Sequence, residues 1–491
     1  MFRIRTKLGN LNRRLLIHPK LLYFATSLFF YTLHMYRSQF VTEMYGVKKS
    51  YWGLYFTIPQ IASLVFGINA AAFVDRLGIQ KWILVGSIGV AMALFGAFFA
   101  ISSFALFLAI FTIYFSCVSV TIPLIDKVVL EFLDRTDGVE MANYGRQRMF
   151  CPIGYIVCCF ILDYIVGTSQ VGGSVVYDFR PLIPYALVTG AAAIGAVLLL
   201  VANLPRQNAA QRSNLRLVGS LLRNSEFTFF ILLIFLNGIT RASMTNYVNV
   251  YYDDHLGFNK DNKNATGLSL YQWIHNGRKK AVAVLFGNIT ELAVYVLSAP
   301  IVCRYGLLLP IFWSQLAQVV RFGGYFLLAA DSPIRFEVVL LLEMVKGVGF
   351  GLIQSSAATL AVRLVASDMK GTAQLVYNGA FIALGTVAAG VGFLFVFNAY
   401  KATGNMIPVA AYKAMFLIDG LLTLLCIGLM LMKYAMKDRV LFDTDRLNEK
   451  LDRISAEALE EEMEDVKEID GQEEEEKVDD LKKVKIAAKE L

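Results

Sequence analysis

The sequence predicts an all-α membrane protein with twelve transmembrane helices in two six-helix bundles. Three observations predict this fold class: long apolar runs, a polar linker halfway along the chain, and basic residues gathered at the ends of the runs. Of the 491 residues, 56% are hydrophobic and 17% are charged, whereas a soluble domain has about 45–50% and about 25%. Each run is roughly twenty residues long, enough for a helix to cross about 30 Å of hydrocarbon.

The apolar runs fall into two sets of six. The first set is expected to span the membrane near residues 20–42, 51–74, 82–102, 104–126, 149–168 and 182–203. The second set is expected near residues 227–251, 281–302, 307–330, 336–365, 372–397 and 410–434. These spans divide the chain into a basic N-terminus (1–19), a first bundle (20–203), a linker (204–226), a second bundle (227–436) and a charged tail (437–491). The tail has few aromatic residues and cannot bury a core, so we expect it to be disordered.

Lysine and arginine residues set the expected orientation. Residues 1–20 and the 204–226 linker are basic with almost no acidic residues, which places both termini in the cytosol and the 252–280 loop outside. Asn264 in that loop begins an Asn-Ala-Thr sequon and is a glycosylation candidate, although Lys279 and Lys280 run against the charge bias. We expect no cleaved signal peptide and a multi-pass protein of the plasma membrane or of an endomembrane such as the vacuole.

Other chemistries lack a signature in this chain. The six cysteines all fall inside apolar runs, so we expect no structural disulfide. The sequence has no Walker motif, no metal-spaced Cys/His group and no nucleophile triad; we therefore expect no enzyme, no cofactor and no metal. The net charge of +7 lies at the ends of the runs and does not indicate nucleic-acid binding. The expected partners of this monomer are a small-molecule substrate, protons and the lipid bilayer.

Charged residues inside apolar runs mark the candidate site. A charge at the bilayer centre costs about 2.5–3.5 kcal/mol, so most such residues must face a cavity, one another or a helix end. A water-accessible charged space between bundles is what a transporter needs. The candidates are Arg37, Asp126, Arg148, Arg241, Glu291, Arg321, Glu343 and Lys346. Arg37 is placed where it could instead reach the outer interface, and Asp126 and Arg148 lie near the cytosolic ends of their runs.

A short motif follows the second apolar run. Residues 73–81 read Phe-Val-Asp-Arg-Leu-Gly-Ile-Gln-Lys. This segment resembles the helix 2–3 loop motif D-R-x-G-x-x-K of the major facilitator superfamily. The resemblance implies the fold of that superfamily and a gating or structural role for Asp75, Arg76, Gly78 and Lys81.

The fourth and fifth runs resemble a particular branch of the superfamily. The quoted segments are Pro123-Leu124-Ile125-Asp126, Tyr144-Gly145-Arg146-Gln147-Arg148-Met149-Phe150 and Gly154-Tyr155. They are similar to the lactose permease-like branch, the oligosaccharide–proton symporters and their eukaryotic relatives. The resemblance implies that Asp126 and Arg148 form part of a substrate site and that Tyr155 stacks on the substrate, although the branch often has glutamate and tryptophan at the first and last of these positions.

The second half extends this resemblance and departs from it. Glu291, nine residues before a proline, and Arg321 match binding residues of the branch. Lys346 stands where relatives tend to have histidine, and Arg241, a further candidate substrate contact, lies in a run where the sugar permease has acids. Of the eight candidates, five are cationic and three anionic, which favours an anionic or zwitterionic solute over a neutral sugar.

The tenth run carries the candidate coupling residues. Glu343 and Lys346 are three residues apart and so share a helix face. We predict that Glu343 carries the proton with Lys346 beside it, and Glu291 is the rival carrier. The Gly347-x-Gly349-x-Gly351 run lies inside an apolar span, which indicates close helix packing or a flexible break rather than a nucleotide loop.

The resulting hypothesis is a proton-coupled secondary active transporter of a small polar organic solute that works by alternating access. An uncoupled uniporter on the same fold is the first alternative. A sensor or scaffold that signals through the charged tail is the second. Flux across liposomes would separate the transporters from the sensor.

Overall fold

The computed structural model describes residues 16–134, 144–171, 174–201, 219, 221, 223–258, 269–275, 278–365, 369–400 and 406–454. Asn264 and most of the 204–226 linker lie outside these ranges. The N-terminal half contains α2 (Ile17–Phe30), α3 (Arg37–Met44), α4 (Trp52–Leu77), α5 (Gln80–Ala97), α6 (Phe104–Ser119), α7 (Thr121–Asp134), α8 (Tyr144–Arg148), α9 (Phe150–Ile165) and α10 (Leu182–Leu200), with short 3₁₀ turns η1 (Lys49–Tyr51) and η2 (Phe98–Ala100).

The C-terminal half begins after the linker. It contains α12 (Ser225–Asp254), the short α13 (Leu270–His275), α14 (Lys279–Tyr305), α15 (Leu308–Leu327), α16 (Arg335–Arg363), α17 (Lys370–Asn378), the π-helical turn η4 (Gly379–Leu384), α18 (Gly385–Ala399), α19 (Val409–Met430) and the π-helical turn η5 (Leu431–Lys437). A 29-residue α16 and a 30-residue α12 are each long enough to cross a bilayer.

The helices confirm the predicted fold class. Among the described residues the helical runs coincide with the twelve predicted spans when α2–α3, α6–α7, α8–α9 and α17–η4–α18 are each counted as one run. In that part of the chain, nine runs are by themselves long and apolar enough to cross a membrane. The other three are α2–α3, which a turn interrupts, and α15 and α16, which carry Arg321, Glu343 and Lys346.

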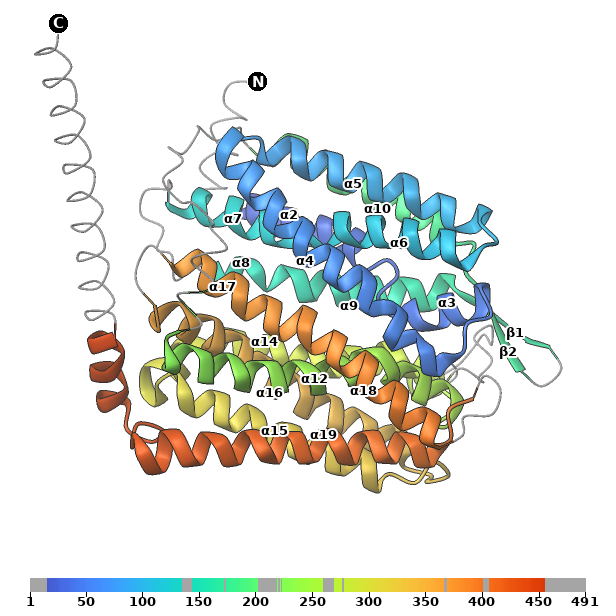
Figure 1. Cartoon of the computed structure of the whole chain (residues 1–491). Coiled ribbons are helices and arrows are strands. Elements are labelled where there is room, and N and C mark those ends of the chain that lie inside the picture. The colour runs from blue at the N-terminus through green and yellow to red at the C-terminus, as the bar shows by residue number, and fades with distance from the viewer. Residues whose placement is uncertain are drawn as a thin grey trace, which may run out of the picture.

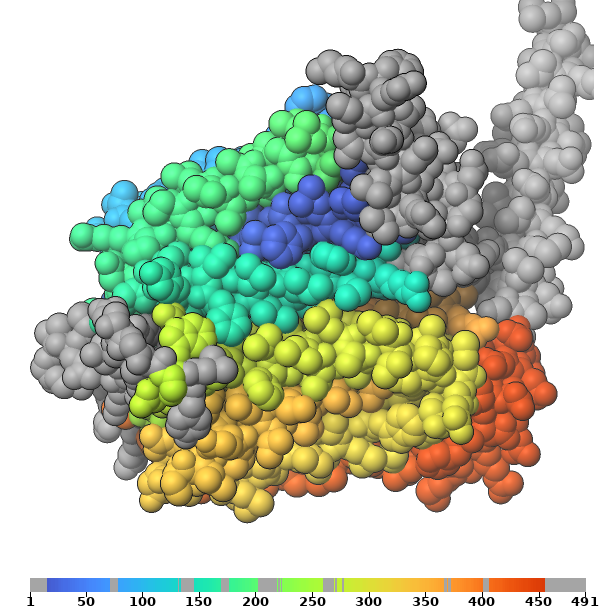
Figure 2. Space-filling model, turned by 180° about the vertical axis from the view of Figure 1, so that it is seen from behind, coloured from blue at the N-terminus to red at the C-terminus, as the bar shows by residue number. Residues whose placement is uncertain are grey.

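The two halves lie side by side with their helices roughly aligned. Figure 1 shows the N-terminal helices in blue and cyan above the green, yellow and red C-terminal helices, with α18 running beside α4. From behind, α9 lies against the C-terminal half along its length (Figure 2), where it packs on α14. Each half has its own buried apolar cluster.

Two features lie at the ends of the bundle: a strand hairpin, which was not predicted, and a helix in the tail. Strands β1 (Gly167–Val171) and β2 (Ser174–Asp178) form an antiparallel hairpin between α9 and α10, and we call this the hairpin end of the molecule. At the opposite end, residues 444–454 form a helix. The prediction of a disordered tail from residue 437 is therefore wrong for these residues, because Leu447 and Leu451 are buried against the C-terminal cluster.

Close helix packing explains the glycines of α16. A Cβ atom at Gly347 would lie 1.9 Å from the carbonyl oxygen of Gly287 on α14, and one at Gly351 would lie 2.8 Å from Val294. No side chain fits at those distances, so α14 and α16 approach through their backbones. This confirms the close-packing interpretation of the glycine run.

Candidate functional site

The predicted pair on the fourth and fifth spans is present. Arg148 Nη2 lies 3.3 Å from Asp126 Oδ2, and the Tyr23 hydroxyl of α2 donates to Asp126 Oδ1 at 2.5 Å. Asp126 does not end its span as expected, because the helix continues through α7 to Asp134. The Arg148 side chain is 46% exposed although it lies in an apolar run, so it reaches a surface that a ligand or water could approach.

Aromatic rings surround the predicted stacking residue. The Tyr155 ring lies 4.3 Å from that of Tyr31 and 5.4 Å from that of His34, both on the first span. Tyr31 and His34 also meet edge to face. Tyr155 thus belongs to an aromatic cluster within the N-terminal half. In the sequence it follows Arg148 by about two helical turns.

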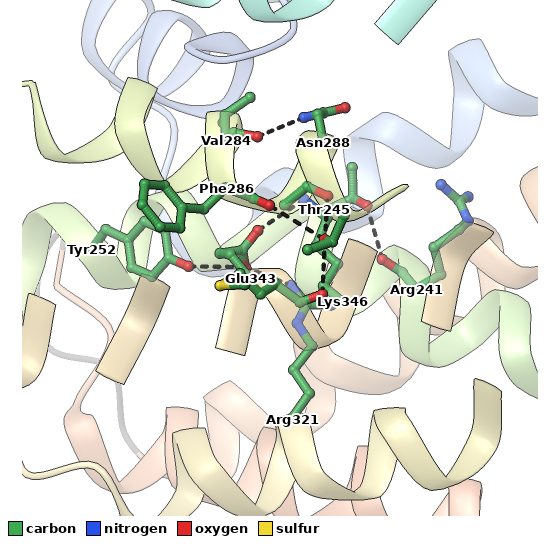
Figure 3. Close-up of polar contacts among 12 residues, drawn as sticks. Arg241, Thr245, Tyr252, Val284, Phe286, Asn288, Arg321, Glu343 and Lys346 are labelled. Carbon is green, nitrogen blue, oxygen red and sulfur yellow. Dashed lines mark hydrogen bonds and ion pairs between the residues drawn. The ribbon is translucent and has the colours of Figure 1, made fainter. Parts of the chain in front are cut away.

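Glu343 is the centre of a buried ion cluster (Figure 3). Its carboxylate accepts from Arg321 Nη2 at 2.9 Å and from Lys346 Nζ at 2.8 Å, as well as from the hydroxyls of Tyr252 at 3.2 Å and Tyr325 at 3.1 Å. The predicted Glu343–Lys346 contact on one face of α16 is present. Arg321, which the resemblance predicts to contact the substrate, pairs with Glu343 in this structure.

Glu291 faces the N-terminal half. It belongs to α14, which packs against α9 and α8 of the N-terminal half, and α8 carries Arg148. Among the described residues Glu291 forms no ion pair within 4 Å, which distinguishes it from Glu343. Charged residues of the two halves therefore lie on helices that meet at the boundary between the halves.

Arg37 and Arg241 lie against aromatic rings. Arg37 does not reach an outer interface: it is 7% exposed, and its guanidinium lies 3.8 Å from the centre of the Phe56 ring. Arg241 lies 5.1 Å from the centre of the Phe381 ring. In Figure 3 the Arg241 guanidinium points away from the Glu343 cluster, and the dashed line at this residue joins its carbonyl oxygen to Thr245.

The superfamily-like loop motif is described only in part. Gly78 has a φ of +67°, a left-handed backbone that glycine adopts without strain. Lys81 Nζ donates to the carbonyl of Leu198 at 2.7 Å, which ties the start of α5 to the end of α10. The side chains of Asp75 and Arg76 are not among those that the structure describes. The geometry therefore supports a structural role for Gly78 and Lys81.

Comparison with known proteins identifies the family. Residues 16–399 match the family model described as "MFS_1 like family". The chain belongs to this family. It is a membrane transporter of the major facilitator type, and the matched region covers all of the candidate site residues named above.

Similar proteins agree with this assignment at the level of the fold. The chain is 24% identical over 403 residues to the "Uncharacterized transporter YwbF" of Bacillus subtilis (strain 168), covering 82% of this chain and 88% of the relative. A crystal structure of the nucleoside transporter NupG superposes with a TM-score of 0.65 at 17% identity, covering 85% of this chain and 99% of that one. An inward-facing, unoccupied bacterial homologue of the human lysosomal transporter Spinster has a TM-score of 0.59 at 13% identity, with 85% and 95% covered.

A second polar group in this MFS_1 like protein joins the halves at the hairpin end. Asp253 of α12 forms an ion pair with Lys280 at 2.8 Å, and its Oδ2 accepts from Gln39 of α3 at 2.8 Å and from the Tyr177 hydroxyl of β2 at 2.9 Å. Burial raises the pKa of the Tyr177 phenol well above its ordinary value, and the charge of Asp253 raises it further, so this hydroxyl stays protonated and donates. We call this group the hairpin-end latch.

Two further contacts extend the hairpin-end latch. Arg278 lies 3.6 Å from Asp163 of α9, and Lys49 lies 2.6 Å from Asp254 of α12. Both contacts cross between the halves. Lys280 was visible in the sequence only as an exception to the orientation bias. Its ion pair with Asp253 lies within the C-terminal half, but its hydrogen bond to the Tyr177 hydroxyl crosses between the halves, and these contacts give a physical reason for that exception.

Two buried acids were not among the sequence candidates. Asp163 on α9 and Asp419 on α19 lie inside apolar runs and are fully buried. Asp419 accepts a hydrogen bond from Ser243 of α12. The rule that selected Glu291, a charge within an apolar run, selects both of these residues as well.

Proposed function

We propose that this protein is a proton-coupled secondary active transporter of a small polar organic solute, which is anionic, zwitterionic or sugar-like, and that it works by alternating access. The observation that carries the proposal is that charged residues of both halves lie on helices in contact at the boundary, Arg148 on α8 and Glu291 on α14. A site shared by two bundles changes its access when the bundles rock against each other.

The proposed substrate contacts follow the resemblance to the lactose permease-like branch. Asp126, Arg148 and Tyr155 would contact the solute from the N-terminal half, and Glu291 would contact it from the C-terminal half. The 3.3 Å Arg148–Asp126 contact and the exposure of Arg148 support this arrangement. The structurally similar NupG is a nucleoside transporter, so nucleosides belong in the solute panel.

Proton coupling is proposed to run through Glu343. Two cations and two tyrosine hydroxyls stabilise its carboxylate in this conformation. Protonation would remove the negative charge that holds Arg321 and Lys346 together. A proton at Glu343 is therefore linked to the opening of the cluster, which is the link that a symporter requires.

The proposed setting is a monomer in the plasma membrane or an endomembrane, with both termini in the cytosol. The basic N-terminus and linker support this orientation. In a variant without the native cysteines, a single cysteine at exposed Ser103, near the hairpin end, should react with a membrane-impermeant maleimide added outside. Reaction only after permeabilisation would reverse the orientation.

Flux measurements test the proposed function. Purified protein in liposomes should accumulate a labelled solute from a panel of sugars, nucleosides, carboxylates and amines when a pH gradient is imposed. Equilibration without accumulation would indicate a uniporter. Binding without any flux would contradict transport and favour the sensor alternative.

A further inference from the structure

Two arginines, one in each half, have no anionic partner among the described residues; Arg37 is buried and Arg241 is partly buried. Arg37 belongs to α3 and Arg241 to α12, and neither forms an ion pair within 4 Å in that part of the chain. The charge of Arg241 acts on Arg37. Two like charges that are withdrawn from water raise the free energy of the empty protein.

Unsatisfied donors accompany these charges. Arg37 Nε, Arg241 Nε and Trp52 Nε1 are buried and lack a hydrogen-bond acceptor within the described residues. Trp52 lies beside Arg37, with 5.9 Å between the guanidinium and the ring centre. Buried donors of this kind are satisfied only when a hydrogen-bond acceptor reaches them.

Groups near the two arginines add positive charge and do not neutralise the charges of Arg37 and Arg241. The charges of Arg37, Lys346 and Arg241 all act on the His34 ring. Lys346 is partly neutralised by Glu343, whereas the two arginines are covered by aromatic rings. A positive potential remains between the halves, and it attracts an anion.

We infer that Arg37 and Arg241 form an anion subsite of the transport site and bind the carboxylate or phosphate group of an organic anion. A guanidinium presents parallel N–H donors that match the oxygens of either group. Because each half supplies one arginine, a bound anion joins the halves and offsets their mutual repulsion. The inference rests on the proposed function and adds the substrate class.

Matched ligands test the chemical class. Thermal unfolding of the purified protein would be followed with glucose, glucuronate and glucose 6-phosphate, and with uridine and uridine monophosphate. A bound ligand raises the melting temperature by mass action. We expect anionic members to raise it and neutral members to leave it unchanged; glucuronate against the phosphates separates a carboxylate from a phosphate preference. Equal stabilisation by the neutral members, or none by any anion, would overturn the inference.

Substitutions test the residues. Arg37→Gln and Arg241→Gln should each weaken binding of the stabilising anion about tenfold or more, because a charged hydrogen bond is lost. Their ligand-free melting temperatures should equal or exceed that of the wild type, since a buried unpaired charge is removed. Arg37→Lys keeps the positive charge but lacks the parallel N–H donors of a guanidinium, and it should bind the anion with intermediate affinity. Arg304→Gln, an exposed arginine of α14, is the control and should bind normally.

The two proposals fail in different ways. Anion binding that depends on both arginines but is not accompanied by flux in liposomes would support the subsite and contradict transport. Flux of a neutral solute that is unchanged in Arg37→Gln and Arg241→Gln would support transport and overturn the subsite.

Discussion

The charged residues inside this protein differ in which groups neutralise them or form hydrogen bonds with them. Glu343 has two cations and two hydroxyl groups around it, whereas Asp126 has Arg148 and the Tyr23 hydroxyl. Arg37 is covered by aromatic rings. Removal of a single charge should therefore have different consequences at each site, and these differences separate binding from stability.

Neutralising either member of the Asp126–Arg148 pair should abolish transport while the protein stays folded. The Arg148 and Asp126 side chains are 46% and 19% exposed, so the pair contributes only about 0–1 kcal/mol to stability. Uptake into liposomes and melting temperature would be measured for Asp126→Asn and Arg148→Gln. Tyr23→Phe keeps the ion pair and should retain more transport than either. Near-normal uptake by a charge variant would contradict a binding role.

Glu343→Gln should remove uphill accumulation and retain exchange. The substitution fixes a neutral side chain at the centre of the ion cluster, so a pH gradient no longer drives the cycle. Accumulation under a pH gradient and counterflow would be measured in liposomes. Glu337→Gln, on the same helix with its side chain 49% exposed, serves as the control. A Glu343→Gln protein that still concentrates solute removes Glu343 from coupling, and loss of counterflow indicates a role in binding or folding.

At the level of helices, backbone contact sets the spacing of α14 and α16. Gly347 meets the Gly287 carbonyl at a distance that leaves no room for a side chain on Gly347. The ion cluster depends on this spacing, because Glu343 lies one turn before Gly347 on α16. Packing and the candidate coupling site are thus parts of one helix pair.

Gly347→Ala should destabilise the protein. The new methyl group would lie 1.9 Å from the Gly287 oxygen, and overpacking costs about 1–3 kcal/mol. Gly392→Ala on α18 has no neighbour within 4 Å and should be neutral or stabilising by up to about 1 kcal/mol. Melting temperatures of the two variants in detergent would be compared. Equal melting temperatures would show that α14 moves away from α16 with little loss of stability.

The tail helix at 444–454 should stabilise the C-terminal half. Val440, Leu441, Leu447 and Leu451 are all less than 5% exposed, and Lys450 contacts Glu226 and Asp438. Truncation after Lys437 should lower the melting temperature, since burial of one such side chain is worth about 1.5–3 kcal/mol. Truncation after Ile454 keeps these contacts and should leave the temperature unchanged. A melting temperature that is lower after truncation at Ile454 than after truncation at Lys437 would contradict a stabilising role for this helix.

For the whole molecule, the hairpin-end latch holds the two halves together at one end. Its contacts come from α3, α9 and β2 on one side and from α12 and α14 on the other. Gly53 of α4 and Gly390 of α18 also meet through their backbones. Alternating access requires these contacts to break together.

Lys280→Met should favour opening at the hairpin end. Removal of one partner from a buried ion pair costs about 3–5 kcal/mol, and each 1.4 kcal/mol changes the ratio of two states about tenfold. Spin labels at Ser103 and Tyr400 would report the separation of the halves, and longer distances should appear. Lys413→Met on α19 is the control. An unchanged distance distribution would show that the latch does not limit opening.

The membrane-spanning segments and most of the charged residues at the candidate site could be predicted from the sequence alone. Run length and the cost of a buried charge are local quantities, so they are visible without any structure. The same local rule applied to Asp163 and Asp419 finds them too. The Glu343–Lys346 contact was likewise predictable, because both residues lie on one helix.

Which of these charges meet depends on how the helices pack. Arg321 pairs with Glu343 of another helix, Asp253 contacts three partners from other elements, and Arg37 lies under aromatic rings instead of reaching an interface. These outcomes depend on the depth and rotation of helices that are distant in the chain. Burial of apolar residues in the bilayer determines that a helix crosses the membrane. Packing against neighbouring helices determines which face of that helix each neighbour contacts.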